Sequence, residues 1–270
     1  MNLGKRIRIN RLFSHSSGRL CSMAVDHYVG YGMGLPAGLQ DMTALFNEII
    51  PGLPGAVTMN KGIAQHCWGP HAGRVPLIIQ AGWFTADDGV METMAHPEEV
   101  LRLGADAIAY SIGVRGPNEG RYMKALAEMV DKASRFDLPV IAHIYPRDFS
   151  AAPPRILHDA ENIAWAARAG LECGADVIKV AYTGDEISFS QIVSQTPAPI
   201  VAAGGPKADT LVDALKLIQA SCRAGGRGAT IGRNIWGHPQ PKLALEAFKR
   251  VILENQDPDG VVSTLFKAQP

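Results

Sequence analysis

The chain has 270 residues, enough for one or two domains of ordinary size, and it also fits a (β/α)8 barrel of about 250 residues as a single unit. Its 26 basic and 26 acidic residues give a formal net charge of zero, so the overall field that draws proteins onto nucleic acid or anionic lipid is missing. Hydrophobic residues make up 47% of the chain and charged residues 19%, which argues against disorder. We therefore expect a globular protein with a small-molecule partner and neither nucleic acid nor membrane.

The cysteine pattern and the chain termini bear on location. The four cysteines lie far apart and form no Cys-x-x-Cys pair, so we expect no zinc ribbon and no disulfide framework, and a reducing cytosol fits best. The longest uncharged stretch, residues 187–206, is interrupted by Ser, Gln, Thr and three prolines, and no transmembrane helix is predicted. Residues 1–25 carry five basic side chains and no acid, as transit peptides do, but no apolar h-region. We interpret residues 1–19 as an ordered basic lead-in to the fold.

Short apolar runs, often β-branched, recur along the whole chain. They predict eight strands, at Leu20–Val25, Ala56–Met59, Val75–Gln80, Ala107–Ile112, Pro139–Tyr145, Val177–Val180, Pro199–Ala203 and Gly228–Ile231. Stretches with apolar residues three and four apart lie between several of these runs. The clearest predict helices at Glu119–Ser134, Asp159–Cys173 and Asp209–Ala220.

The alternation of strands and helices decides the fold class. Gly104, Gly174 and Gly225 follow predicted helices, where a glycine is the usual stop. Several strands are almost wholly apolar, as parallel strands buried on both faces should be. Eight βα units fill the length with no obvious linker. We therefore predict α/β class, a single (β/α)8 TIM barrel over residues 1–270, in preference to an open doubly wound sheet.

In such a barrel the active site lies at the C-terminal ends of the strands, so the polar residues that end each run are the candidates. Lys179 stands in an otherwise apolar strand, where its ammonium loses hydration. One interpretation is an amine of lowered pKa that attacks a carbonyl and forms a Schiff base. The other is a structural ion pair with Asp176, Asp185 or a loop carboxylate. Position alone leaves the two equal.

Two further strand ends carry groups that move protons. Asp26 closes the first strand and could carry a proton or bind substrate hydroxyls, or it could cap a loop. Tyr145 ends the fifth strand, where its phenol could exchange protons with a substrate oxygen or simply pack in the core. His143 lies two residues earlier and should point to the same side, into the barrel. His27 follows Asp26, and we assign both histidines to the substrate site.

Glycine-containing loops follow the last two predicted strands. Gly204 and Gly205 come after the seventh strand, and Gly232 with Arg233 after the eighth. In many barrels these two loops bind a phosphate through backbone N–H groups, and Arg233 could add a charged hydrogen bond. The two loops together predict a phosphorylated substrate.

One local cluster has metal-ligand residue types. His66, Cys67 and His71 match no standard spacing for zinc, and Gly69 and Pro70 make the segment a loop. A metal-dependent enzyme that uses His66 and His71 is retained as an alternative, and we expect no metal.

Six segments together resemble the class I aldolases of the DeoC/LacD/DhnA type, particularly the archaeal-type fructose-bisphosphate aldolases. The match spans most of the chain. The segments are Gly4–Phe13, Ala24–His27, Tyr145–Arg147, Gly174–Asp185, Gly204–Lys207 and Gly232–Asn234. The basic opening resembles the segment before the first barrel strand in that family.

The resemblance implies a function and a set of roles. Lys179 would form the Schiff base, Tyr145 would be the general acid and base, and Asp26 would assist proton transfer. The glycines 204, 205 and 232 with Arg233 would hold a substrate phosphate. Neither metal nor other cofactor is then required, and relatives form rings, commonly decamers, so we expect a homo-oligomer.

The chain departs from the family pattern at His143, where fructose-bisphosphate aldolases of this type usually have an aromatic residue. The loops 28–36 and 81–88 match no specificity known to us. The alternatives are a synthase that condenses a deoxy-ketosugar phosphate with aspartate semialdehyde, a thiolase-like transferase acting on a phosphorylated dione, and a non-catalytic barrel that binds a phosphate ligand.

Overall fold

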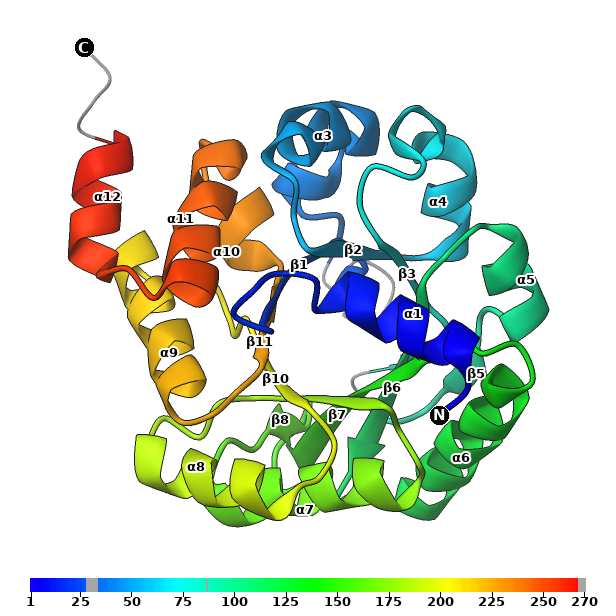
Figure 1. Ribbon diagram of the computed structural model, residues 1–270. Coiled ribbons are helices and arrows are strands. Elements are labelled where there is room, and N and C mark those ends of the chain that lie inside the picture. The colour runs from blue at the N-terminus through cyan, green and yellow to red at the C-terminus, as the bar shows by residue number, and fades with distance from the viewer. Residues whose placement is uncertain (28–33, 86, 267–270) are drawn as a thin grey trace.

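Eight parallel strands close into a barrel that helices surround (Figure 1). The computed structural model describes residues 1–27, 34–85 and 87–266. Each barrel strand pairs in parallel with its two neighbours, and the last pairs with the first. The barrel strands are β1 (Leu20–Ala24), β2 (Ala56–Met59), β3 (Leu77–Gln80), β6 (Ala107–Val114), β7 (Val140–Asp148), β9 (Val177–Val180), β10 (Ile200–Ala203) and β11 (Gly228–Ile231). The predicted TIM barrel is confirmed.

Helices follow most strands and cover the outside of the barrel. The α-helices are α1 (Leu3–Leu12), α3 (Met42–Ile49), α4 (Lys61–Cys67), α5 (Pro97–Arg102), α6 (Glu119–Ser134), α7 (Ala160–Glu172), α8 (Glu186–Gln195), α9 (Leu211–Arg223), α10 (Arg233–Trp236), α11 (Pro241–Glu254) and α12 (Pro258–Phe266). Short 3-10 turns lie at η1 (Ala37–Leu39), η2 (Ile50–Gly52) and η3 (Gly69–His71). Within the described residues, no helix is long and apolar enough to span a membrane.

Local chemistry explains where the predicted helices begin and end. Asp159 caps α7 by accepting a hydrogen bond from the backbone N–H of Asn162, and Thr210 caps α9 in the same way. Gly174 follows α7 with a φ of +80°, a left-handed conformation that favours glycine. The predicted boundaries of these helices were therefore accurate to within a few residues.

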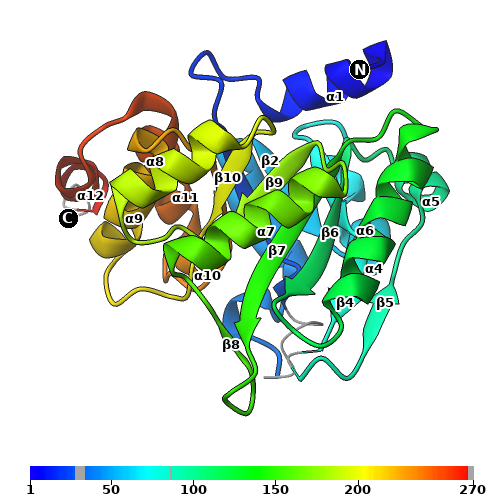
Figure 2. The ribbon, with the colours of Figure 1, turned by 90° about the horizontal axis from the view of Figure 1, so that it is seen from below.

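The barrel interior has two layers of different chemistry. At the N-terminal ends of the strands it is apolar, and the members of this layer are Leu12, Leu20, Ala56, Ile78, Ala107, Ala109, Ile141, Val177 and Val201. Leu12 comes from α1, which lies across this end of the barrel (Figures 1 and 2). Since α1 closes the bottom with an apolar plug, the polar interior residues can meet a ligand only from the opposite end.

The basic lead-in is ordered, as predicted, and ion pairs hold it in place. Lys5 on α1 binds Asp176 at 3.0 Å, and Arg11 binds Asp106 at 3.0 Å. Asp106 and Asp176 occupy equivalent turns, each just before a barrel strand. The basic residues of the opening thus neutralise carboxylates at the closed end of the barrel.

Two small antiparallel elements were not predicted. β4 (Gly82–Phe84) and β5 (Met91–Thr93) form a hairpin after β3, and β8 (Arg155–Ile156) pairs with the end of β7. They lie at the end of the barrel opposite α1 (Figure 2). This end is therefore extended by β structure beside the strand ends that carry the candidate site.

Candidate active site

The strand register brings the inward polar residues to similar heights. Lys179 on β9 lies opposite His143 on β7, and His143 lies opposite Ser111 on β6. Gln80 on β3 lies opposite Ala109, one inward position before Ser111. Adjacent strands are only about 4.8 Å apart, so these side chains share one polar layer above the apolar plug.

Lys179 is buried, with 6% of its surface exposed. Burial lowers the pKa of its amine below the ordinary value. The carboxylate of Asp26 opposes this shift, and the positive charge of Arg233 adds to it. The site therefore favours the neutral amine, the form that attacks a carbonyl.

The alternative interpretation of Lys179, a structural ion pair with Asp176 or Asp185, is wrong. Asp176 binds Lys5 and accepts a hydrogen bond from the backbone of Val140. Asp185 caps α8 by accepting from the backbone N–H of Ser188 at 2.7 Å. Over the described ranges Lys179 forms no ion pair with any carboxylate. The nearby carboxylate that acts on its charge is Asp26.

The carboxylate of Asp26 accepts a hydrogen bond from Gln80. The amide Nε2 of Gln80 donates to Asp26 Oδ2 at 2.8 Å and to Ser111 Oγ at 2.8 Å, and it lies 3.3 Å from His143 Nδ1. Two of the predicted residues, Asp26 and His143, are thus joined through one amide that the sequence-based site did not include.

Both predicted histidines are neutral at physiological pH. Burial is the main cause, and it lowers the pKa of His27 to about 4 and that of His143 well below its ordinary value. When Lys179 carries its proton, its positive charge acts in the same direction on both. His27 Nδ1 is 3.6 Å from Asp26 Oδ1, but a neutral imidazole makes this contact polar rather than ionic.

Tyr145 lies one inward position beyond His143 on β7, about 6.6 Å further along the strand. It is half-buried, and its ring packs against Phe84 of the β4–β5 hairpin with a centroid distance of 6.0 Å. The β4–β5 hairpin therefore packs against Tyr145, the residue predicted to be the general acid and base.

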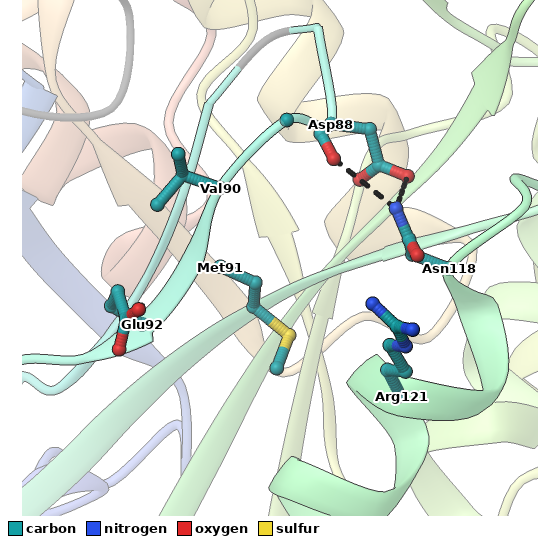
Figure 3. Close-up of a pocket in the computed structure, with 7 residues that line it drawn as sticks. Asp88, Val90, Met91, Glu92, Asn118 and Arg121 are labelled. Atoms are coloured by element: carbon teal, nitrogen blue, oxygen red, sulfur yellow. Dashed lines mark hydrogen bonds between the residues drawn. The ribbon is translucent and has the colours of Figure 1, made fainter.

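A buried ion pair anchors this hairpin. Asp88 pairs with Arg147, the residue two after Tyr145, and their side chains are 3% and 4% exposed. Tyr122 and Asn118 donate hydrogen bonds to the same carboxylate. A surface hollow lies beside this cluster and is lined by Asp88, Gly89, Val90, Met91, Glu92, Asn118 and Arg121 (Figure 3). None of the predicted site residues lines it.

The two glycine loops meet, as the phosphate prediction requires. Arg233 Nη2 donates to the carbonyl of Gly205 at 3.0 Å, and Asn234 Nδ2 donates to the carbonyl of Gly204 at 3.0 Å. A Cβ on Gly232 would lie 2.2 Å from Cε1 of His27, so only glycine fits there. Close packing thus places this loop directly against His27.

The alternative metal cluster does not form. His66 is exposed on α4, whereas His71 is buried against Trp68 and Phe46. Burial lowers the pKa of His71. In the described parts of the chain, no three His, Cys, Asp or Glu side chains come close enough to hold a metal ion.

Comparison with known proteins identifies the family. The model of the DeoC/LacD family aldolases matches residues 20–238, from the first barrel strand to the loop after the last. The chain belongs to the DeoC/LacD family of aldolases.

Curated relatives match this aldolase over nearly its whole length. It is 32% identical to a 2-amino-3,7-dideoxy-D-threo-hept-6-ulosonate synthase of Halobacterium salinarum, with 96% of each chain covered. It is 27% identical to a 2-amino-4,5-dihydroxy-6-oxo-7-(phosphonooxy)heptanoate synthase of Streptomyces griseus, with 88% of this chain and 86% of the relative covered.

Solved structures of aldolases superimpose on this one closely. An archaeal fructose 1,6-bisphosphate aldolase is 29% identical, with a TM-score of 0.82 over 93% of this chain and 99% of the other. A structure of an archaeal fructose-1,6-bisphosphate aldolase with its catalytic lysine covalently bound to the carbinolamine intermediate is 30% identical to this chain, with a TM-score of 0.78 over 93% of this chain and 98% of the other. The resemblance inferred from the six segments is confirmed.

Sequence reasoning missed Ser111 and Phe84 as parts of this aldolase's candidate site. Gln80 is among the polar residues that end the predicted strands, but no role was assigned to it. Ser111 lies inside an apolar run, and only the register with β7 shows that it is level with His143. Phe84 lies in a hairpin whose strands have three residues each, too short for a periodicity to be read.

Proposed function

We propose that this aldolase forms a Schiff base at Lys179 and breaks or makes a carbon–carbon bond in a phosphorylated ketose of the fructose-bisphosphate kind. The observation that carries the proposal is the amine itself. It is buried at the open end of the barrel, it forms no ion pair within the described chain, and its pKa is lowered. A lowered pKa raises the fraction of neutral amine, which is the nucleophilic form.

In the first step, the lone pair of Lys179 Nζ attacks the ketose carbonyl carbon. The carbonyl π electrons move to the oxygen, which takes up a proton, and the nitrogen loses one. A second proton on that oxygen lets it leave as water, and a protonated imine remains. Its positive charge withdraws electrons from the neighbouring carbon–carbon bond.

In the second step, Tyr145 takes the proton from the hydroxyl on the carbon beyond the bond that breaks. The electrons of that bond move to the imine nitrogen, which releases an aldehyde and leaves an enamine. Protonation of the enamine carbon and hydrolysis release the second product and restore Lys179. Asp26 and its bond to Gln80 supply a carboxylate of fixed orientation for these transfers.

Phosphate recognition is assigned to the loops after β10 and β11. Gly204, Gly205 and Gly232 permit close approach of backbone N–H groups, and Arg233 adds a positive charge. The positive charge of Arg233 also lowers the pKa of Lys179. Arg233 would therefore affect both the binding of the phosphate and the reactivity of the amine. His27 and His143 would contact substrate oxygens between these ends.

A second candidate is a synthase that joins a phosphorylated keto compound to a different acceptor. The 32% identity to the Halobacterium salinarum synthase favours it. His143 replaces the usual aromatic residue at the point where the acceptor would lie, so it could bind a polar acceptor group. Both candidates use the same Schiff base at Lys179, and a panel of acceptor aldehydes separates them.

Borohydride trapping tests the shared chemistry. Incubation with dihydroxyacetone phosphate and borohydride should leave a reduced adduct on the peptide that contains Lys179. Lys179→Met should abolish the adduct. Lys5→Met, which changes a lysine at the closed end, should keep it. An adduct at another lysine, or none at all, would remove the proposed nucleophile.

Activity and binding assays separate the remaining alternatives. A metal-dependent aldolase would lose activity on treatment with a chelator, and a non-catalytic barrel would bind ketose phosphates without turnover. We propose further that the protein is cytosolic and forms a homo-oligomer, with a decamer suggested by the family. Sedimentation of a single 28.9 kDa species, the mass of one chain, at micromolar concentration would contradict the proposed homo-oligomer.

A further inference from the structure

The amide of Gln80 contacts two residues of the proposed site, and the proposed mechanism uses only its contact with Asp26. Gln80 is 8% exposed at the end of β3. Its Nε2 is 2.8 Å from Asp26 Oδ2, 2.8 Å from Ser111 Oγ and 3.3 Å from His143 Nδ1. Three groups from three different strand ends thus converge on a single nitrogen.

The neighbouring carboxylate fixes the orientation of the amide. A carboxylate only accepts hydrogen bonds, so an amide group 2.8 Å away must present its N–H. The amide oxygen then faces the other way, and in the described structure this buried Oε1 has no hydrogen-bond partner. A glutamine kept only for stability would not leave its carbonyl unsatisfied, because burial of an unpaired acceptor is costly.

The orientation of the amide decides the tautomer of His143. The two N–H groups of the amide point to Asp26 Oδ2 and Ser111 Oγ at 2.8 Å, and His143 Nδ1 is a longer third contact at 3.3 Å. An amide nitrogen cannot accept a hydrogen bond, so a proton on His143 Nδ1 would face these N–H groups and find no acceptor there. The lone pair of Nδ1 must face the amide, and the single proton of the neutral ring lies on Nε2. Burial keeps the ring neutral, because it lowers the pKa of His143 well below its ordinary value.

We propose that Gln80 is a positioning residue that anchors Asp26 and holds His143 in the Nε2–H tautomer, so that His143 donates a hydrogen bond to a substrate oxygen beside the carbon attacked by Lys179. The register supports this assignment, because His143 and Lys179 lie opposite each other on adjacent strands. The identity of the oxygen rests on the proposed function, whereas the tautomer does not.

The tautomer is tested first, on the wild-type protein without substrate. Nitrogen NMR of protein labelled in its histidines, with the His143 signals assigned from a His143→Phe variant, distinguishes protonated from unprotonated ring nitrogens. We expect Nδ1 unprotonated and Nε2 protonated at pH 7. A proton on Nδ1, or a doubly protonated ring, would overturn the proposal even if the enzyme proves to be an aldolase.

The second test removes the amide. Gln80→Met keeps the length of the side chain, and it should leave borohydride trapping at Lys179 intact while kcat falls roughly 10- to 100-fold, the usual result of misplacing a catalytic group. The His143 nitrogen signals should shift toward a mixture of tautomers. Gln219→Met is the matched control, because Gln219 is 9% exposed and donates to the carbonyl of Gln256 far from the site.

The outcomes separate positioning from packing. A kcat reduced alike in both variants, with His143 signals unchanged in Gln80→Met, would make Gln80 a structural residue and refute the proposal. Loss of trapping in the wild-type protein would refute the proposed function alone, and the tautomer measurement would still stand.

Discussion

The ion pair between Asp88 and Arg147 offers the sharpest test of how the hairpin is held. Asp88 has a φ of +65°, a left-handed conformation that asparagine tolerates well. Asp88→Asn therefore removes the negative charge with little change in shape or backbone strain. It leaves the Arg147 guanidinium, 4% exposed, without its carboxylate.

Breaking a buried pair by removing one partner costs about 3–5 kcal/mol, because the other charge stays buried. That is a large part of the 5–15 kcal/mol that stabilises a typical domain. For 270 residues, with an unfolding entropy of about 2.1 cal/mol/K per residue, the loss corresponds to a Tm lower by roughly 5–9 °C. The kcat should fall as well, since Phe84 of the same hairpin packs on Tyr145.

Chemical and thermal denaturation measure the effect. Glu172→Gln is the control, because it removes one partner of an exposed pair with Arg168 and should cost no more than about 1 kcal/mol. The double variant Asp88→Asn, Arg147→Met should regain part of the lost stability, since no unpaired charge remains. If Asp88→Asn costs no more than the control, the buried pair is not what holds the hairpin.

Three further predictions concern the chemistry. Tyr145→Phe should retain trapping at Lys179 but lose turnover by roughly 10²- to 10⁴-fold, and equal loss of both would deny it a proton-transfer role. Arg233→Ala should raise KM for phosphorylated substrates, because it removes a charged hydrogen bond that contributes about 1.5–3 kcal/mol to the binding free energy. An unchanged KM would refute the contact. Because burial lowers the pKa of Lys179, the trapping rate should rise with pH and level off below the pH at which an ordinary lysine loses its proton, whereas a rise only in that range would contradict a neutral amine.

The barrel was predictable because its strands are apolar on both faces and its helices carry their own start and stop residues. Asp159 and Gly174 mark the ends of α7 in the sequence as they do in the structure. The β4–β5 hairpin was not predictable, because each strand has three residues and its stability comes from Asp88 binding side chains 59 and 34 positions away. Such pairings leave no local pattern.

The candidate site divides in the same way. Strand ends identified Lys179, Asp26, His143 and Tyr145, because the barrel rule places chemistry there. The competing ion pairs of Lys179 could not be decided from sequence. Asp176 lies three residues from Lys179, and only the structure shows that Lys5, from the other end of the chain, already neutralises it.

The charged residues have different roles at the two ends of the barrel. Those at the closed end stabilise the fold, and those at the open end act on Lys179. At the closed end, Lys5 forms an ion pair with Asp176, and Arg11 forms one with Asp106. The negative charges of these two carboxylates are therefore balanced locally. At the open end the charges acting on Lys179 are then Asp26 and Arg233, which have opposite effects on its pKa. Burial is the largest influence on this pKa and lowers it, which favours the neutral amine. A phosphate bound at Arg233 would weaken the cationic member of the pair. In the proposed mechanism, the lowered pKa would favour the free amine before the substrate arrives, and the bound phosphate would favour the cationic imine after it has formed.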